Sequence, residues 1–121
     1  MLKDNLYTIS SIEKRSDDSY AVGIALDASH NIFKGHFPGQ PVLPGVCLIE
    51  MVKEILTTIK EKPYKLENAN QIKYVQLVDP NASPTLNMSL QIKEEAGSLH
   101  VNVNSCLENG ASHFKLKGIF S

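Results

Sequence analysis

The chain has 121 residues, of which 42% are hydrophobic and 21% are charged, as is ordinary for a single globular domain spanning residues 1–121. Its formal net charge of −1 gives no electrostatic basis for binding nucleic acid or a membrane surface. The N-terminal residues lack the apolar stretch of a secretion signal, and no apolar run is long enough to span a membrane. Two cysteines do not make a disulfide framework, and no Cys-x-x-Cys pair indicates a metal site. We therefore expect a reduced, cytoplasmic protein.

Two strands are expected at the start of the chain. Residues 6–14 form the first, and the polar residues 16–19 turn the chain. The second strand follows from apolar side chains that alternate with smaller residues, namely Tyr20, Val22, Ile24 and Leu26.

A loop over residues 27–44 leads into a helix that is expected from about residue 44 to residue 60, before Pro63. The loop is rich in proline and glycine, which restrict the backbone and permit close approach to it. The helix has an apolar stripe with helical spacing, formed by Leu48, Ile49, Val52, Ile55, Leu56 and Ile59. Glu50 projects away from this stripe, so it should meet either water or another chain.

The second half of the chain is expected to be a series of antiparallel strands. Residues 64–70 are a weaker connecting segment, and a strand covers residues 71–78. Alternating apolar residues then predict strands over 86–92 and 99–107. The sequence Glu108-Asn109-Gly110 predicts a hairpin, and the last strand carries Phe114, Leu116 and Phe120 on one face and His113, Lys115 and Lys117 on the other.

Two strands, one long helix and four more strands form an α+β pattern. The economical arrangement is a curved antiparallel sheet wrapped around the single helix. One helix cannot cover six strands, so sheet edges would stay open, and pairing of two chains with C2 symmetry is the usual way to cover them.

The loop and the start of the helix contain a motif that resembles the signature of a known family. Residues 35–50 read GHFPGQPVLPGVCLIE, which resembles the signature of the (3R)-hydroxyacyl-acyl carrier protein dehydratases of the FabZ/FabA group. The resemblance implies the hot-dog fold, which agrees with the arrangement expected from the strand and helix pattern. It also implies side-by-side dimers, sometimes trimers of dimers, with active sites at the dimer interface.

The implied reaction converts a (3R)-3-hydroxyacyl-acyl carrier protein into the trans-2-enoyl form and water, in fatty acid, polyene or pigment synthesis. His36 fits the base, because imidazole titrates near neutral pH and an apolar loop lowers its pKa. Gly45 fits the oxyanion donor, because unpaired amides at a helix start favour negative charge. Glu50 fits the acid, because an apolar surrounding raises the pKa of a carboxyl group. In the family, this acid comes from the neighbouring protomer.

Other residues of the motif are expected to have structural roles. Phe37, Pro38, Val42 and Val46 are expected to form scaffold and pocket wall, and Cys47 is expected to be a small buried residue. The reaction requires no metal or organic cofactor, since the substrate is carried on the phosphopantetheine arm of acyl carrier protein. Carrier docking is expected on a basic patch, for which Lys60, Lys62 and Lys65 are candidates, although a solvated helix end explains the same cluster.

The chain departs from the family pattern at Glu54, where relatives commonly have glutamine. A second acid one helical turn after Glu50 can alter neighbouring pKa values, alter acyl preference or remove turnover. Two other functions therefore stay open. One is a hot-dog thioesterase in which Glu50 activates water, and the other is a non-catalytic subunit that binds an acyl carrier.

Overall fold

The structure is a computed structural model, and it describes residues 2–33 and 42–121. Its elements in chain order are β1 (Tyr7–Lys14), β2 (Ser19–Leu26), the 3-10 helix η1 (Asn31–Phe33), α1 (Gly45–Lys60), β3 (Leu66–Tyr74), β4 (Thr85–Glu95), β5 (Ser98–Leu107) and β6 (Ser112–Phe120). None of the helices in these two ranges is long and apolar enough to cross a membrane.

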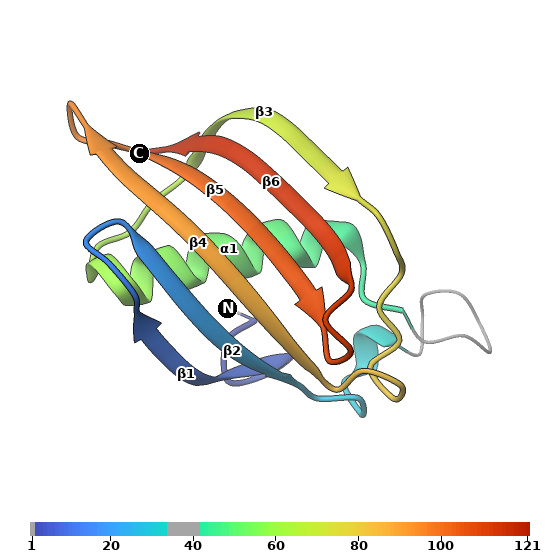
Figure 1. The fold of residues 1–121 in the computed structure, drawn as a ribbon. Coiled ribbons are helices and arrows are strands. Elements are labelled where there is room, and N and C mark those ends of the chain that lie inside the picture. The colour runs from blue at the N-terminus through green and yellow to red at the C-terminus, as the bar shows by residue number, and fades with distance from the viewer. Residues whose placement is uncertain (1, 34–41) are drawn as a thin grey trace.

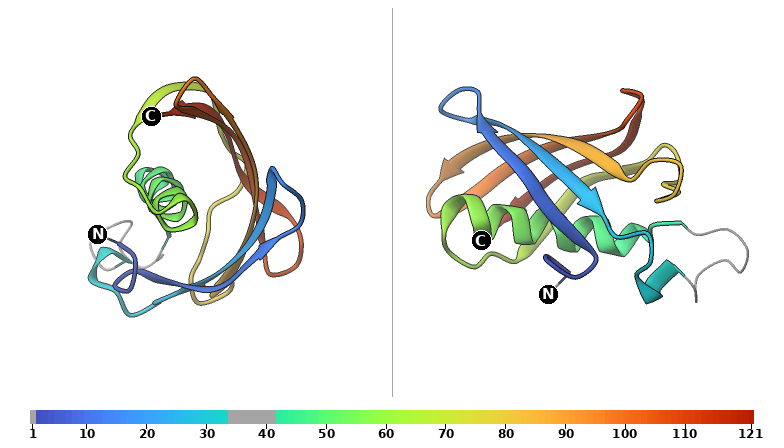
Figure 2. Two further views of the ribbon diagram at one scale, coloured as in Figure 1. Left: turned by 90° about the vertical axis from the view of Figure 1, so that its left-hand side faces the viewer. Right: turned by 90° about the horizontal axis from the view of Figure 1, so that it is seen from below.

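The strands form one antiparallel sheet in the order β1-β2-β4-β5-β6-β3. The sheet curves strongly, and α1 lies along its concave side (Figure 1). A view along the helix shows the strands bending around it from both flanks (Figure 2). This is the hot-dog architecture, so the predicted α+β fold class is confirmed.

The core forms between α1 and the concave face of the sheet. On β4, apolar side chains alternate with polar ones as predicted, and the inward set is fully buried. Burying a side chain of this size stabilises the fold by about 2 kcal/mol. The helix contributes the apolar residues Cys47, Leu48, Met51, Val52, Ile55 and Leu56. The predicted stripe is therefore largely confirmed, although Ile49 and Ile59 are only partly buried at its margins.

The strand predicted over residues 71–78 is displaced in the structure. β3 covers Leu66–Tyr74 and pairs with β6, so it includes the segment expected to be a connection. β3 lies at the edge of the sheet, and most of its side chains are exposed, so its sequence lacks the apolar alternation of a half-buried strand. After Tyr74 the chain leaves the ladder, and the Val75 amide donates to the His113 carbonyl at 2.8 Å.

The predicted orientation of His113 is wrong. The pairing of β5 with β6 shifts after Ser105, so that Ser105 faces Phe114 and Cys106 faces Ser112. His113 is the additional residue of this irregularity, and its side chain is fully buried instead of facing water with the lysines of β6. Its Nε2 lies 2.7 Å from Ser105 Oγ, whereas Nδ1 has no hydrogen-bond partner among the described residues.

Burial of His113 should make the stability of the fold depend on pH. Desolvation lowers its pKa from 6.5 to about 4, so the folded chain keeps the imidazole neutral while the unfolded chain takes up a proton between these values. The free energy of unfolding therefore keeps its full value above pH 6.5. It falls as the pH drops towards 4, by up to about 3 kcal/mol. Urea unfolding at several pH values should show this slope, and His113→Gln should reduce it.

His100 provides the matched control, because its side chain is 44% exposed. His100→Gln should change the slope much less than His113→Gln, because the contact of its ring with Glu95 at 3.6 Å lies at the surface. Equal slopes for His113→Gln and the wild type would contradict the assignment of the pH dependence to His113.

Candidate active site at the start of the central helix

The first turn of α1 offers a site for developing negative charge. Pro44 precedes the helix in an extended conformation, with φ −63° and ψ 142°, and makes no side-chain hydrogen bond that would cap the helix. The Cys47 amide donates to the Pro44 carbonyl at 3.1 Å, and Gly45 is the first helical residue. Amides in the first turn lack intrahelical acceptors and lie at the positive end of the helix dipole. This arrangement is compatible with the predicted role of the Gly45 amide.

Tyr74 covers Gly45, a contact that the sequence did not indicate. Its hydroxyl donates to the Gly45 carbonyl at 3.0 Å, and its ring packs at a tilt on Phe114 with 5.4 Å between centroids. A Cβ atom built on Gly45 would lie 2.7–2.9 Å from ring and hydroxyl atoms of Tyr74. Glycine therefore permits the close approach of the tyrosine ring, and a larger residue here would displace the ring, whose side chain is half-exposed.

Glu50 lies on α1 at the border between buried and exposed side chains. Its side chain is 42% exposed, and its carboxylate lies 3.6 Å from the Lys53 ammonium. The prediction that Glu50 projects from the buried stripe agrees with this position. The apolar surrounding that we expected for its carboxyl group is not formed by residues 2–33 and 42–121 of this chain.

The remaining predicted residues divide into two groups. Val42 is buried next to the core, whereas Val46 is 75% exposed in the first turn of α1. His36, Phe37 and Pro38 lie outside the described residues, so the structure does not test whether His36 meets Glu50 or Gly45.

Cys47 occupies the position of a structural residue, not that of a reactive thiol. Cys47 is buried, as predicted, and burial raises the pKa of its thiol, which disfavours the nucleophilic thiolate. Within residues 2–33 and 42–121, no three side chains of His, Cys, Asp or Glu lie close enough together to hold a metal ion.

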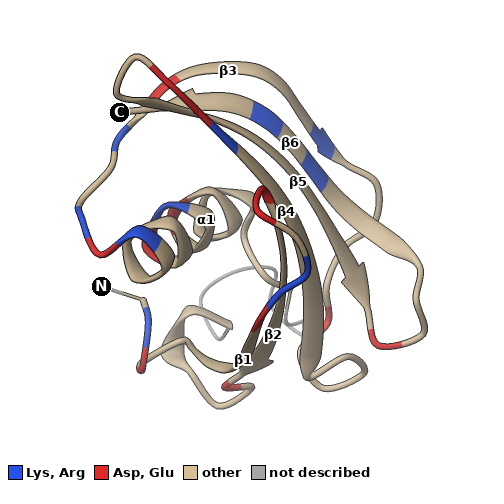
Figure 3. Cartoon of the chain, turned by 60° about the vertical axis from the view of Figure 1, so that its left-hand side comes forward, with Lys and Arg blue, Asp and Glu red and all other residues tan. Residues whose placement is uncertain are grey.

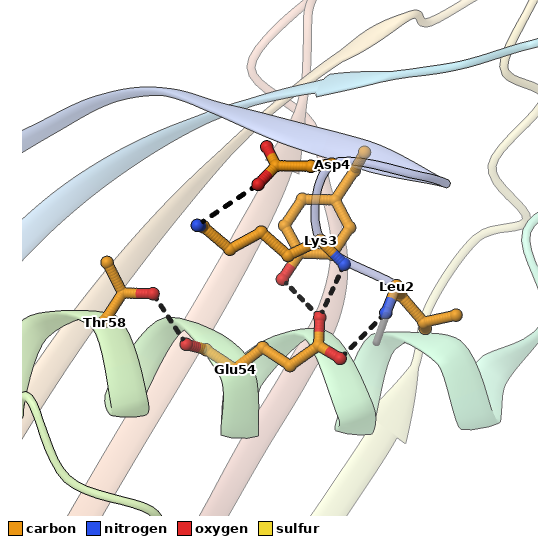
Figure 4. Close-up of polar contacts among 6 residues, drawn as sticks. Leu2, Lys3, Asp4, Glu54 and Thr58 are labelled. Atoms are coloured by element: carbon orange, nitrogen blue, oxygen red, sulfur yellow. Dashed lines mark hydrogen bonds and ion pairs between the residues drawn. The ribbon is translucent and has the colours of Figure 1, made fainter.

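Glu54 is the second acid on the helix, and it is buried with only 3% of its surface exposed. Its carboxylate accepts hydrogen bonds from the Leu2 amide at 2.9 Å, the Lys3 amide at 2.8 Å and the Tyr7 hydroxyl at 2.9 Å. Figure 4 shows the N-terminal segment folded over α1 to make these contacts. Glu54 thus fastens residues 2–7 onto the helix.

The same contacts affect Tyr7, which is almost completely buried. Burial raises the pKa of its phenol, and the hydrogen bond to Glu54 raises it further, so Tyr7 remains a neutral donor. One feature of the sequence points to burial of Glu54. It follows Met51, which is buried, by three residues, so the two side chains share a face of the helix. The partners of Glu54 come from a distant part of the chain, so the sequence did not identify them.

Comparison with known proteins places this chain in a family. The family model described as ApeI-like, ApeI dehydratase, matches residues 12–115. The FabZ 3-hydroxyacyl-(acyl-carrier-protein) dehydratase of Oenococcus oeni is 32% identical over 81 residues, which are 60% of this chain and 58% of that protein. The FabZ of Rhizorhabdus wittichii is 27% identical over 61% of this chain and 48% of its own length. The chain therefore spans about half the length of these curated relatives.

Solved structures share the fold. The ApeI:P dehydratase heterocomplex from Xenorhabdus doucetiae has a TM-score of 0.70 and 24% identity, over 90% of this chain and 94% of that one. A hypothetical thioesterase with coenzyme A from Streptococcus pneumoniae has a TM-score of 0.61 and 16% identity, over 94% and 83%.

The fold defines a protein of the hot-dog class. Because the family model covers most of the chain, from residue 12 to residue 115, the protein belongs to the ApeI-like dehydratase family.

The hydrogen bonds of Glu54 should contribute measurably to stability. Glu54→Ala leaves two amides and a phenol without their buried acceptor and should lower the free energy of unfolding by about 3 kcal/mol. Tyr7→Phe removes one of the donors and should cost about 1 kcal/mol. Urea unfolding of both variants and their combination should show non-additive losses.

Glu50→Gln is the control for this series, because Glu50 is half-exposed and its ion pair with Lys53 lies at the surface, so the change should alter stability by no more than about 0.5 kcal/mol. Additive losses for the Glu54 and Tyr7 variants would contradict a direct interaction between the two side chains.

Gly45→Ala should destabilise the fold through Tyr74. The new Cβ atom displaces the half-exposed ring, which loses its hydrogen bond to the Gly45 carbonyl at a cost of about 1 kcal/mol. In a Tyr74→Ala background the ring is absent, and the higher helix propensity of alanine should make the same substitution neutral or stabilising. Thermal unfolding of the four chains tests this reversal of sign. Equal effects in both backgrounds would exclude Tyr74 as the reason for glycine.

Proposed function

We propose that this protein dehydrates a (3R)-3-hydroxyacyl thioester carried on acyl carrier protein. The single observation that supports this most strongly is the position of Gly45 and Glu50 on α1. Gly45 begins the helix around which the sheet wraps, and Glu50 lies on its incompletely buried border. The spacing of these residues is that of the motif in residues 35–50, and family membership supports the same reaction.

In the proposed reaction, His36 removes a proton from C2 of the acyl group. The thioester carbonyl gains negative charge, which the Gly45 amide stabilises, and the C2–C3 double bond forms as the C3–O bond breaks. Glu50 protonates the departing hydroxyl, so water leaves and the enoyl thioester remains. General acid–base groups of this kind contribute about 10²–10⁴ to the rate, and an oxyanion donor contributes about 10²–10³. We propose that no metal or organic cofactor takes part.

We also propose that the active site is completed by a second chain. Several exposed apolar residues gather at the end of β3 and the start of α1, which the contact of Tyr74 with Gly45 brings together; these residues are Val46, Tyr74, Val75 and Leu77. β3 is the last strand of the sheet, and no other strand among the described residues pairs with its outer side. A C2-symmetric partner that pairs with β3 would cover both features and could bring its His36 to Glu50.

The proposed partner is a second copy of the chain. Assembly of three such dimers into a trimer of dimers is the larger alternative. The structural neighbour from Xenorhabdus doucetiae is a heterocomplex, so a related but different chain is the alternative partner. A second copy of the chain and a related chain would both pair with the edge strand β3 in the same way.

The reaction is tested by incubating the protein with a 3-hydroxyacyl carrier substrate and measuring enoyl absorbance and free thiol. Enoyl product without thiol supports dehydration. Thiol release instead supports the thioesterase, and binding without either product supports a non-catalytic subunit. His36→Ala and Glu50→Gln should each lower enoyl formation by about 10² or more. Activity of His36→Ala within about threefold of wild type would remove His36 as the base.

A mixing experiment tests whether the acid and the base come from opposite chains. His36→Ala and Glu50→Gln chains are each inactive, but a mixed dimer contains one site with both natural residues. Refolding the two variants together should therefore restore up to about a quarter of wild-type activity, since about half of randomly paired dimers are mixed and each has one intact site. No recovery in verified mixed dimers would show that both residues act within one chain.

A further inference from the structure

Three lysines form a group on the convex face of the sheet. Lys73 of β3 lies directly opposite Lys115 of β6, and Lys117 follows on the same face of β6, because side chains two residues apart in a strand point to the same side. All three are exposed. Figure 3 shows the basic positions of β3 and β6 side by side. We refer to Lys73, Lys115 and Lys117 as the lysine cluster.

The lysine cluster forms no ion pair with the acidic residues that the structure describes. Lys115 lies opposite Asn104 and Lys117 opposite Asn102 on β5, so the adjoining strand presents amides. Within residues 2–33 and 42–121, no ion pair involves these lysines, and residues 34–41 contain no Asp or Glu. Like charges that face each other across a strand pair are destabilising, which indicates that the cluster serves something other than stability.

Protection of the sheet edge does not account for the cluster. Lysines on an edge strand commonly prevent unwanted pairing, and this explanation fits Lys73 alone. Lys115 and Lys117 lie on β6, which is paired on both sides by β5 and β3. Their charges therefore do not protect an edge.

The cluster lies near the candidate active site. Lys73 immediately precedes Tyr74, whose hydroxyl binds the Gly45 carbonyl at the start of α1. The other basic group lies at the opposite end of this 16-residue helix, about 24 Å away along the helix axis. It consists of Lys60, Lys62 and Lys65. A substrate tethered to a protein bound at the lysine cluster would have the shorter path to Gly45.

We infer that the lysine cluster is the docking surface for an acidic protein domain that carries the acyl thioester. The inference rests on the proposed function, and it places docking on the convex face at β3 and β6 instead of at the end of α1. Opposite charge across such a surface accelerates encounter and fixes the orientation of the partner. Pairing of two chains through β3 would bring two lysine clusters to either side of the junction and enlarge the basic area.

The test compares two substrates with the same acyl group, one on acyl carrier protein and one on pantetheine, which lacks the protein. Changing Lys73, Lys115 and Lys117 together to Glu should raise KM for the carrier substrate by about tenfold or more and weaken its salt dependence. The value of kcat/KM for the pantetheine substrate should stay within about twofold. The same three residues changed to Gln provide a milder variant if charge reversal impairs folding.

The matched control changes Lys60, Lys62 and Lys65 to Glu, which alters the charge equally at the other end of α1. An unchanged KM for the carrier in the cluster variants, or a larger effect in the control, would overturn the inference. Equal losses with both substrates would also overturn it, because the lysines would then act on the reaction itself.

Direct binding separates this inference from the proposed function. Acylated carrier protein should bind the wild-type chain and not the cluster variants in a titration, even if no enoyl product forms with either substrate. Absence of product with intact, lysine-dependent binding would contradict only the proposed reaction. Binding of an oligonucleotide in place of the carrier at these lysines would overturn the inference.

Discussion

Burial of one face of α1 against a curved sheet is the constraint on which the rest of this structure depends. The helix is held by apolar contacts along its length, so the position of its first residue is fixed relative to the sheet. Gly45 and Tyr74 meet because the end of β3 and the start of α1 reach the same place. The uncapped amides of the first turn and the carboxylate of Glu50 then occupy defined positions on a rigid element, as a catalytic site requires.

Glu54 adds a second connection to the same helix. A buried carboxylate is unfavourable unless several donors satisfy it, and here two amides and a phenol do so. Glutamine at this position would replace one of the two accepting oxygens by an amide NH2 that faces a donor, so the acid matches the N-terminal donors better. The departure from the family pattern at Glu54 thus has a structural explanation that does not involve loss of the reaction.

The molecule also has features that a single chain does not explain. Apolar side chains remain exposed around the end of β3, Glu50 pairs with Lys53, and no ion pair between residues that the structure describes involves the lysine cluster. These features occupy different surfaces: the sheet edge, the helix border and the convex face. A second hot-dog chain and an acidic carrier would account for them without competing for the same area.

The sequence by itself determined the fold class, the bounds of α1 and most strands, and the residues of the motif, because hydrophobic period and turn residues are local signals. Tertiary structure decided the extent of β3, since an edge strand exposed on both faces carries no alternation. It also turned His113 inward, because a shift in pairing between β5 and β6 changes which face a residue occupies. The partners of Glu54 and Gly45 depended on tertiary structure for the same reason: Tyr7 and Tyr74 are far from them in the chain, and only the wrapping of the sheet around the helix brings each pair into contact.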